Sequence, residues 1–170
     1  VDVGERVVII GGGSTGCETA LYLARIGALD PATAYFLMLN DAEEFSTIRE
    51  LLIKGTKKVV ILEMLEKIGA GFGRSTRWTV LQELRKRGVE MLTKARVVKI
   101  TEDGVLAKRN GEELHFPADT VINATGVLPQ RSLYDKLKGK IQELYIIGDA
   151  KSAGRVLDAV HQGFELGLKI

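Results

Sequence analysis

Residues 11–16 read Gly-Gly-Gly-Ser-Thr-Gly and have the spacing G-x-G-x-x-G. The pattern follows a β-branched run at 6–10 and opens a helical pattern, the context in which it marks a phosphate-binding turn. There, Gly11 permits the tight turn, Gly13 lets the backbone approach a pyrophosphate, and Gly16 lets helix and strand pack closely. The helix start adds N–H groups and a positive dipole end. The plainer alternative is a glycine-rich turn without a ligand.

An acidic residue about 20 positions after such a turn holds the adenosine ribose hydroxyls. Glu63 comes 47 positions after Gly16, but residues 28–56 have the pattern of an inserted helical hairpin. Without these 29 residues the spacing becomes 18, so we predict that Glu63 is the ribose partner. Because a carboxylate repels a 2′-phosphate, the sequence favours NAD(H) over NADP(H). Arg74 and Arg77 could bind a phosphate, but a solvated basic helix start explains them more simply.

The elements that position these residues follow from hydrophobic periodicity. Buried strands are expected at 6–10, 58–62, 121–124 and 144–147, and helices at 14–26, 31–39, 43–53, 75–87 and 154–168. Asp30 and Ser75 are the expected caps of two of these helices. Runs at 89–92, 95–100 and 105–108, with hairpin signals at Asp103-Gly104 and Asn110-Gly111, predict an antiparallel meander. The predicted fold class is α/β: a Rossmann-like three-layer domain with a parallel central sheet, the meander and the hairpin insert.

Composition narrows the class of partner. The 170 residues carry 24 basic and 22 acidic side chains, mixed along the chain, so neither nucleic acid nor a membrane surface is an expected partner. No run approaches the roughly 18 apolar residues that span a bilayer. The single cysteine, Cys17, excludes an internal disulfide and fits a reducing compartment, so we expect a cytoplasmic protein. The abrupt start at Val1 suggests an excised domain.

Other residues with chemical potential have simpler explanations. Cys17 is expected to fill space against the strand, although a helix dipole can lower a thiol pKa. His115 and His161 are expected to be structural, and Trp78 to pack. Glu18 is open between a ligand role and the stabilisation that any carboxylate gives to a first helical turn.

Four segments together resemble a known group of enzymes. They are Val7–Ala24 (VVIIGGGSTGCETALYLA), Ile61–Met64 (ILEM), Ala124–Pro129 (ATGVLP) and Tyr145–Ala150 (YIIGDA). Over nearly the whole chain they are similar to flavoproteins with two dinucleotide-binding domains. With Arg74–Trp78 (RSTRW) and Leu157–Val160 (LDAV), the chain more closely resembles the C-terminal half of NADH:flavin oxidoreductases of the 2,4-dienoyl-CoA reductase, 2-enoate reductase and trimethylamine dehydrogenase type. In that family a barrel with FMN and an iron–sulfur cluster precedes an FAD-type domain, into which an NAD(H) domain is inserted.

The resemblance implies cofactor contacts for individual residues. The pyrophosphate motif corresponds to Gly11, Gly12, Gly13, Ser14, Thr15 and Gly16, and the ribose acid to Glu63, with Met64 beside it. Glu18 corresponds to a carboxylate near the nicotinamide end, and Val97 to a position near the adenine. The turn Ala124-Thr125-Gly126 corresponds to one that passes close to the dinucleotide. Gly148-Asp149 corresponds to a motif whose aspartate holds the ribityl chain of a flavin.

The chain also departs from that family. It has one G-x-G-x-x-G, so the family's flavin-binding copy is absent, and it has no cysteine cluster for an iron–sulfur centre. We therefore expect an NAD(H)-binding domain at 1–130 and, at 131–170, the returning C-terminal part of an incomplete FAD-type domain. Asp149 would then contact FAD or FMN only in a full-length parent. The insert at 28–56 has two open explanations, a partner or interdomain contact and a solvated ornament.

The function implied by the resemblance is that of an NAD(H)-binding fragment of an NADH-dependent flavin oxidoreductase. It would deliver hydride from NADH to a flavin borne by other domains of the same parent chain. We identify no catalytic acid, base or nucleophile, so the fragment is not expected to turn over alone. An alternative is a stand-alone non-catalytic dinucleotide-binding module or sensor. A stand-alone pyridine-nucleotide disulfide or ferredoxin reductase is a second rival, and the lone cysteine disfavours the disulfide type.

Overall fold

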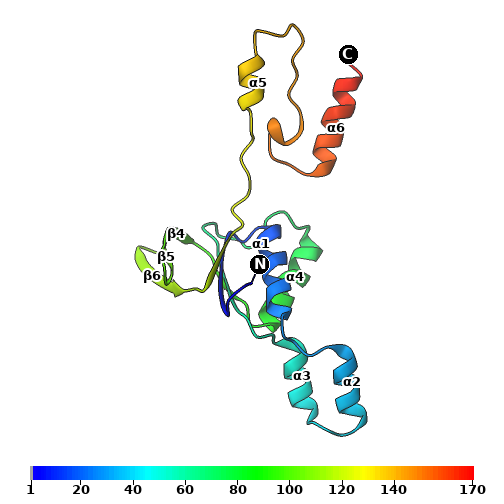
Figure 1. The fold of residues 1–170 in the computed structure, drawn as a ribbon, viewed down its shortest axis with the longest axis vertical. Coiled ribbons are helices and arrows are strands. Elements are labelled where there is room, and N and C mark those ends of the chain that lie inside the picture. Colours follow the sequence, from blue (N-terminus) through cyan, green and yellow to red (C-terminus); the bar gives the residue numbers. More distant parts are fainter. Residues whose placement is uncertain (1) are drawn as a thin grey trace. The chain divides into compact units, whose positions relative to one another are not determined.

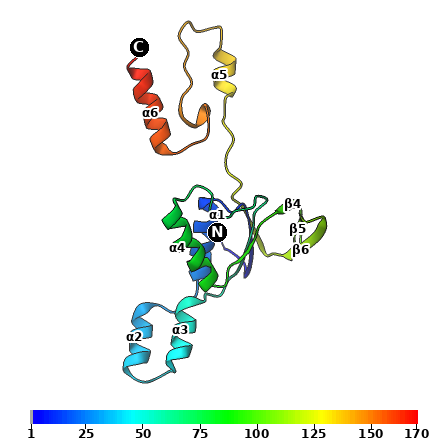
Figure 2. The same ribbon diagram turned by 180° about the vertical axis from the view of Figure 1, so that it is seen from behind.

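The computed structural model describes residues 2–170, which Figures 1 and 2 show from opposite sides. They divide into two units, one ending at Thr125 and the other comprising Gly126–Ile170. The first contains a parallel sheet in the order β3-β2-β1-β7. Its strands are β1 (Arg6–Ile10), β2 (Lys58–Leu62), β3 (Glu90–Leu92) and β7 (Thr120–Asn123). The central strand, β1, pairs with β2 on one side and with β7 on the other, as its run of β-branched residues predicts.

Two helices cover one face of this sheet and an antiparallel sheet covers the other (Figure 1). The helices are α1 (Ser14–Arg25) and α4 (Arg74–Lys86), and the antiparallel strands are β4 (Ala95–Ile100), β5 (Gly104–Arg109) and β6 (Glu112–Pro117). The core on the helical side includes Ile9, Ile61 and Leu84, and the core on the other side includes Val8 and Val105. Successive β1 residues thus supply opposite cores, which confirms the predicted three-layer class.

The meander contains different strands from those predicted. The run at 89–92 was expected in the antiparallel sheet, but β3 pairs in parallel with β2 at the edge of the main sheet. Its position follows from α4, which forms a crossover connection between two parallel strands. The third antiparallel strand is β6, joined to β5 by Asn110 and Gly111, whose φ angles of +52° and +89° suit the predicted tight turn.

The predicted insert is a pair of packed helices, α2 (Pro31–Leu39) and α3 (Phe45–Ile53). Asp30 caps α2 as expected, because its Oδ1 accepts hydrogen bonds from the N–H groups of Ala32 and Thr33, both at 3.0 Å. The backbone fixes the base of the hairpin, where the N–H of Leu29 donates to the carbonyl of Leu51 at 2.9 Å. α3 begins two residues later than predicted, with Glu44 as its N-cap.

Two expectations about α4 are wrong. Gly73, not Ser75, is its N-cap, and no side chain caps the helix. Trp78 does not pack into the core, because 63% of the residue is exposed. The helix buries Leu81 and Leu84 instead, and Trp78 lies outside that apolar stripe.

The unit from Gly126 to Ile170 contains α5 (Ser132–Leu137), a 3₁₀ turn η1 (Gly148–Ala150) and α6 (Val156–Gly167). The N–H of Gly148 donates to Oε1 of Gln162 at 2.8 Å, which ties the turn to α6. The predicted strand at 144–147 is wrong: the segment has no strand assignment and pairs with no strand in the described part of the chain. An apolar run forms a strand only where another strand satisfies its backbone groups. None of the helices within residues 2–170 has the length and apolar character needed to cross a bilayer.

Candidate functional site

Three strands end at the same edge of the parallel sheet and bring the predicted site residues together there. Because β1 lies between β2 and β7, the turn after β1 lies between Glu63 and Ala124. The N–H of Gly11 donates to the carbonyl of Leu62 at 2.9 Å, and the N–H of Ala124 donates to the carbonyl of Ile10 at 2.8 Å. Ligands of open α/β sheets bind at this carboxyl edge.

The three motif glycines have different structural reasons. Gly11 has a φ of +106°, and a Cβ there would overlap the carbonyl oxygen of Ala124. A Cβ on Gly16 would overlap the carbonyl oxygen of Gly11, so this glycine allows α1 to pack against the turn. A Cβ on Gly13 would have only one neighbour, the carbonyl oxygen of Ala70 at 3.9 Å. Gly13 therefore leaves open space at the helix start, where a phosphate group can approach the backbone.

Glu63 is the buried acid of this edge, with 8% of the residue exposed. Its Oε2 accepts a hydrogen bond from the N–H of Gly12 at 2.7 Å, and its Oε1 accepts one from the N–H of Leu65 at 2.8 Å. Carboxylate oxygens offer about four acceptor positions in all, so two remain for further donors. The backbone of Glu63 is also fixed, because its N–H donates to the carbonyl of Leu92 at 2.8 Å.

Gly12 completes the link between turn and acid. It is buried, and a Cβ there would come to 2.9 Å from Cγ1 of Ile68 and 3.1 Å from Cβ of Glu63. The middle glycine of the motif thus holds the acid in place and leaves the ligand-facing role to Gly13.

The N-terminus of α1 offers backbone donors to a ligand. No group within residues 2–170 accepts a hydrogen bond from the N–H of Thr15 or Gly16, the second and third residues of the helix. The N–H of Ser14 is already used, because it donates to the carbonyl of Ala70 at 3.1 Å. Free N–H groups at a helix start bind anions, so this end of α1 can accept a phosphate.

A loop at 68–73, which we call the strap, lies against the glycine turn. The N–H of Gly69 donates to the carbonyl of Gly12 at 2.6 Å, and Gly13 and Ala70 form an isolated parallel bridge. Arg77 holds the strap from α4, donating from Nε to the carbonyl of Ile68 at 2.7 Å. The expectation of a solvated Arg77 is therefore wrong, although Arg74 is exposed. The contacts between the strap and the glycine turn were not predicted, because they join backbone groups, which every residue carries.

Cys17 and Glu18 lie one turn into α1. Cys17 is fully buried, and its Sγ donates to the carbonyl of Gly12 at 3.5 Å. Burial raises the pKa of Cys17 to about 11, so the thiol fills space as predicted and is not an activated nucleophile. Glu18 is exposed, and the first turn of α1 contains no acidic residue. Because Glu18 lies beyond that turn, the predicted helix-start stabilisation does not account for it.

The remaining predicted residues are spread more widely. Thr125 is exposed, and its hydroxyl donates to Oδ1 of Asn123 at 2.8 Å, which shapes the turn after β7. No role was predicted for Asn123, although an asparagine side chain favours a turn by bonding to the backbone two residues on; here Oδ1 of Asn123 also accepts from the N–H of Thr125 at 3.2 Å. Met64 is 60% exposed beside the acid. Val97 lies on β4, half-buried against the core between the two sheets.

Gly126 and the predicted flavin motif belong to the second unit. Gly126 has a φ of +95°, as a glycine turn requires, and open space around it. Gly148 begins η1, and the exposed Asp149 accepts a hydrogen bond at Oδ1 from the N–H of Gly154 at 3.2 Å.

Neither histidine belongs to the site. Nε2 of His115 lies 3.4 Å from Oδ2 of Asp103 on the antiparallel sheet, and His161 is exposed on α6. In the part of the chain that the structure describes, no three His, Cys, Asp or Glu side chains are grouped as a metal site. What the sheet edge can do chemically is bind phosphates at α1 and hydroxyl groups at Glu63.

Known proteins resemble this chain in sequence and in fold. The chain is 46% identical over 166 residues to a metal reductase of Desulforamulus reducens, covering 98% of the chain and 25% of that protein. It is 32% identical over 171 residues to an NADH oxidase of Thermoanaerobacter brockii, covering 99% of the chain and 22% of that protein. The chain thus spans about a quarter of the length of these relatives. The solved structure of a complex of 2-naphthoyl-CoA reductase has the same fold, with a TM-score of 0.71 at 23% identity over 100% of this chain and 22% of that one.

A family model covers the sheet, the strap and most of the second unit. It is described as pyridine nucleotide-disulphide oxidoreductase and matches residues 1–162, which include both the glycine turn and Asp149. The relatives are oxidoreductases by name, in agreement with the redox role that the sequence predicts. The chain belongs to the pyridine nucleotide-disulphide oxidoreductase family.

Proposed function

We propose that the chain binds NADH at the carboxyl edge of its parallel sheet and, as part of a longer protein, positions it to reduce a flavin. The observation that carries the proposal is the pairing of Gly13, which has open space, with Glu63, which is fixed by two N–H donors and keeps free acceptor positions. A dinucleotide needs both features, a close backbone approach for its pyrophosphate and an acid for its ribose.

The residues present fit such a ligand. The N–H groups of Thr15 and Gly16 would bind the pyrophosphate at the start of α1, and the carboxylate of Glu63 would accept hydrogen bonds from the ribose hydroxyls. Val97 is assigned to the adenine end and Glu18 to the nicotinamide end, and Thr125 to the turn that passes close to the dinucleotide. When bound, NADH supplies a hydride from its nicotinamide ring. The chain itself binds and orients the cofactor.

The preference for NADH over NADPH rests on charge. A 2′-phosphate would meet the buried carboxylate of Glu63, and like charges in a partly desolvated site repel strongly. Arg77, one of the two arginines that could neutralise that phosphate, uses Nε to hold the carbonyl of Ile68. The arrangement therefore favours a ribose with free hydroxyls.

The second part of the proposal concerns the parent protein. We assign residues 1–130 to the NAD(H) domain and 131–170 to the returning end of an FAD-type domain, with Asp149 as a contact for FAD or FMN. Asp149 is exposed and already accepts one hydrogen bond, so flavin binding would need groups from the flavin-bearing domains of the parent chain. We further propose an enoate or dienoyl-CoA reductase-like parent in the cytoplasm.

Calorimetric titration of the 170-residue chain with NADH, NADPH and FAD tests the proposal. We expect NADH to bind at least about tenfold more tightly than NADPH, which is a difference of about 1.4 kcal/mol, and FAD to give no saturable heat. Equal binding of NADPH would contradict the role of Glu63. Steady NADH oxidation by the purified chain without added flavin would contradict the assignment as one part of a larger enzyme.

A further inference from the structure

The helix α2 has no charged residue in its nine positions, and only Ala34 is buried. Large side chains point outward, with Tyr35 63%, Phe36 60% and Leu39 66% exposed. A helix that is apolar on all sides normally lies inside a protein, because exposing apolar side chains to water is unfavourable on every face. α3 covers only part of α2, and no other element within residues 2–170 covers the exposed side chains of α2.

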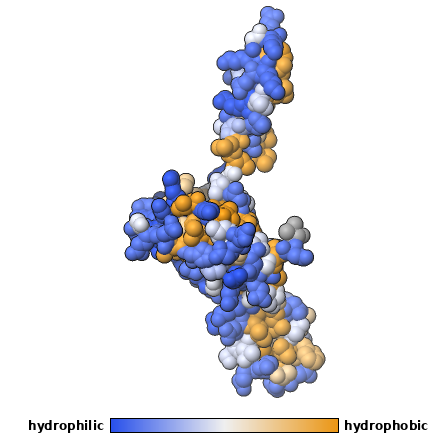
Figure 3. Space-filling view, turned by 60° about the vertical axis from the view of Figure 1, so that its left-hand side comes forward, coloured by the Kyte–Doolittle hydropathy of each residue, from blue (hydrophilic) through white to orange (hydrophobic). Residues whose placement is uncertain are grey.

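The exposed apolar surface continues from α2 to α3. Phe45, at the start of α3, is 68% exposed. At these exposed fractions Tyr35, Phe36 and Phe45 together present roughly 290–480 Å², taking a typical aromatic side chain as about 150–250 Å². That is the size of the largest patch on a typical monomer, and such patches often bind another molecule. Figure 3 shows hydrophobic side chains gathered on this hairpin, in the lower part of the view.

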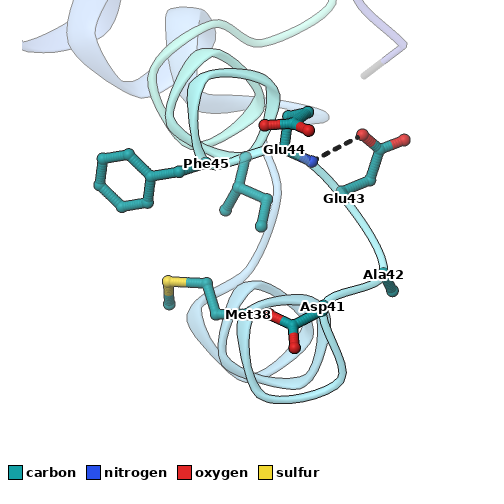
Figure 4. A pocket seen from close by; sticks show the side chains of 7 residues that line it. Met38, Asp41, Ala42, Glu43, Glu44 and Phe45 are labelled. Carbon is teal, nitrogen blue, oxygen red and sulfur yellow. Dashed lines mark hydrogen bonds between the residues drawn. The ribbon is translucent and has the colours of Figure 1, made fainter.

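Acidic side chains surround a pocket at the tip of the hairpin (Figure 4). The pocket has a volume of about 650 Å³ and is lined by Met38, Ala42, Phe45, Ile48, Asp41, Glu43 and Glu44. Within residues 2–170 no lysine or arginine forms an ion pair with Asp41, Glu43 or Glu44. Residues 28–56 contain five acidic and two basic side chains, a charge of −3 in a chain of +2, so the acidity is specific to the hairpin.

We propose that the hairpin α2–α3 is a docking arm for a protein partner that presents an amphipathic helix edged with lysine or arginine. Apolar side chains of that helix would cover Phe36 and Phe45, and its cations would pair with the three acids at the tip. Charge complementarity selects this occupant, because fixed unmatched acids attract cations and repel anions. A second copy would bring the same acids to the contact, and an anionic membrane would be repelled.

Fluorescence anisotropy with a designed peptide tests the proposal on the 170-residue chain. The probe is a labelled helical peptide with leucine at positions i, i+3, i+4 and i+7 and lysine elsewhere, and its match has glutamate in place of lysine. We expect the lysine peptide to bind at least about tenfold more tightly than the glutamate peptide at low salt, and to weaken at high salt.

Matched variants locate the binding. We expect Phe36→Ser and the triple variant D41N/E43Q/E44Q each to weaken lysine-peptide binding about tenfold or more. Phe164→Ser, on exposed α6, and the triple variant E90Q/E112Q/E113Q make similar changes elsewhere and should leave it unchanged. Cooperative urea unfolding reports that each variant is folded.

Three results would overturn the proposal. One is equal binding of the two peptides, and another is equal loss in the hairpin variants and their matched controls. The third is a different occupant: dimerisation in sedimentation equilibrium that Phe36→Ser abolishes would assign the face to a second copy, and hairpin-dependent binding to phosphatidylglycerol vesicles would assign it to a membrane.

Discussion

The backbone N–H of Gly12 donates a hydrogen bond to Oε2 of Glu63 at 2.7 Å, although the two residues lie 51 positions apart in the chain. The contact joins the turn after β1 to the end of β2, and both groups are buried. The acid therefore has a structural role as well as its proposed ribose contact. Substitution of Glu63 should therefore change both the stability of the chain and its binding of NADH, and each can be measured separately.

Glu63→Gln should lower both stability and NADH affinity. The glutamine keeps one acceptor oxygen, so one of the N–H groups of Gly12 and Leu65 would face an amide NH₂ instead. An unsatisfied polar group of this kind costs about 1–3 kcal/mol. We expect a loss of that size in urea unfolding and about tenfold weaker NADH binding in calorimetry. NADPH should lose less, because the repelling charge is gone.

The matched control is Glu66→Gln. Glu66 is exposed, and its only described ion pair is with Lys94, at 2.9 Å on the surface. Surface pairs contribute little, so we expect a change within about 0.5 kcal/mol and unaltered NADH affinity. An E63Q protein that behaves like E66Q in both measurements would contradict the assignment of Glu63.

Alanine at two glycines of the turn should give opposite results. Gly16→Ala places a Cβ on the carbonyl oxygen of Gly11, and we expect it to destabilise by about 3 kcal/mol or more. Gly13→Ala meets open space at a φ of −68°, so stability should change by less than about 1 kcal/mol. Its methyl group occupies the approach of the phosphate, and NADH should bind about tenfold more weakly. Normal NADH affinity in Gly13→Ala would place the ligand elsewhere.

Local patterns predicted much of the nucleotide-binding unit. The strands at 6–10 and 58–62 have the bounds expected from their β-branched runs, because burial on both faces of a sheet demands a continuous apolar run. Asp30 caps α2, as an aspartate directly before a helix predicts. The displaced acid was located only by treating 28–56 as an insert, and α2 and α3 confirm that insert.

What the sequence did not predict depends on tertiary partners. The run at 89–92 has the same alternation whether it joins a parallel edge or a meander, and only the path of α4 decides. Residues 144–147 are apolar but pair with no strand in the part of the chain from residue 2 onward, which periodicity does not reveal. The strap at 68–73 contacts the glycine turn through carbonyl and N–H groups that every residue carries, so its glycines indicate a loop but not the partner of that loop.

Cys17 should make the protein less stable in alkali. Its pKa is raised to about 11 by burial, whereas an unfolded chain has a thiol pKa near about 8.5. The folded form therefore holds a proton that the unfolded form loses, and stability falls as pH rises between these values. Across this range we expect the unfolding free energy of the wild type to fall relative to that of Cys17→Ala. A difference that is independent of pH would contradict the raised pKa.

The same burial should protect the thiol from chemical modification. Iodoacetamide reacts with the thiolate, and Cys17 is fully buried at the base of the turn. We expect slow labelling of the folded chain at pH about 8 and rapid labelling in urea, followed by mass spectrometry. Rapid labelling of the folded chain would show that the turn opens readily.

Asp119 should give the opposite dependence on pH, in acid. It accepts hydrogen bonds from the N–H of Arg6 at 2.8 Å and from Nε of Arg6 at 3.1 Å, which ties the start of β7 to β1. Arg6 lowers the pKa of Asp119 to about 2. The folded pKa lies below the unfolded value of about 3.9, so the ionised carboxylate stabilises the folded chain at pH values above about 3.9. This stabilisation is lost as pH falls toward about 2. The unfolding free energies of wild type and Asp119→Asn, measured in urea, should therefore converge as pH falls from about 4 to about 2.

Arg6→Gln removes the guanidinium and leaves the backbone donor, so its stability should depend less on acid pH than that of wild type. An unchanged dependence in Arg6→Gln would mean that the guanidinium does not set the pKa of Asp119.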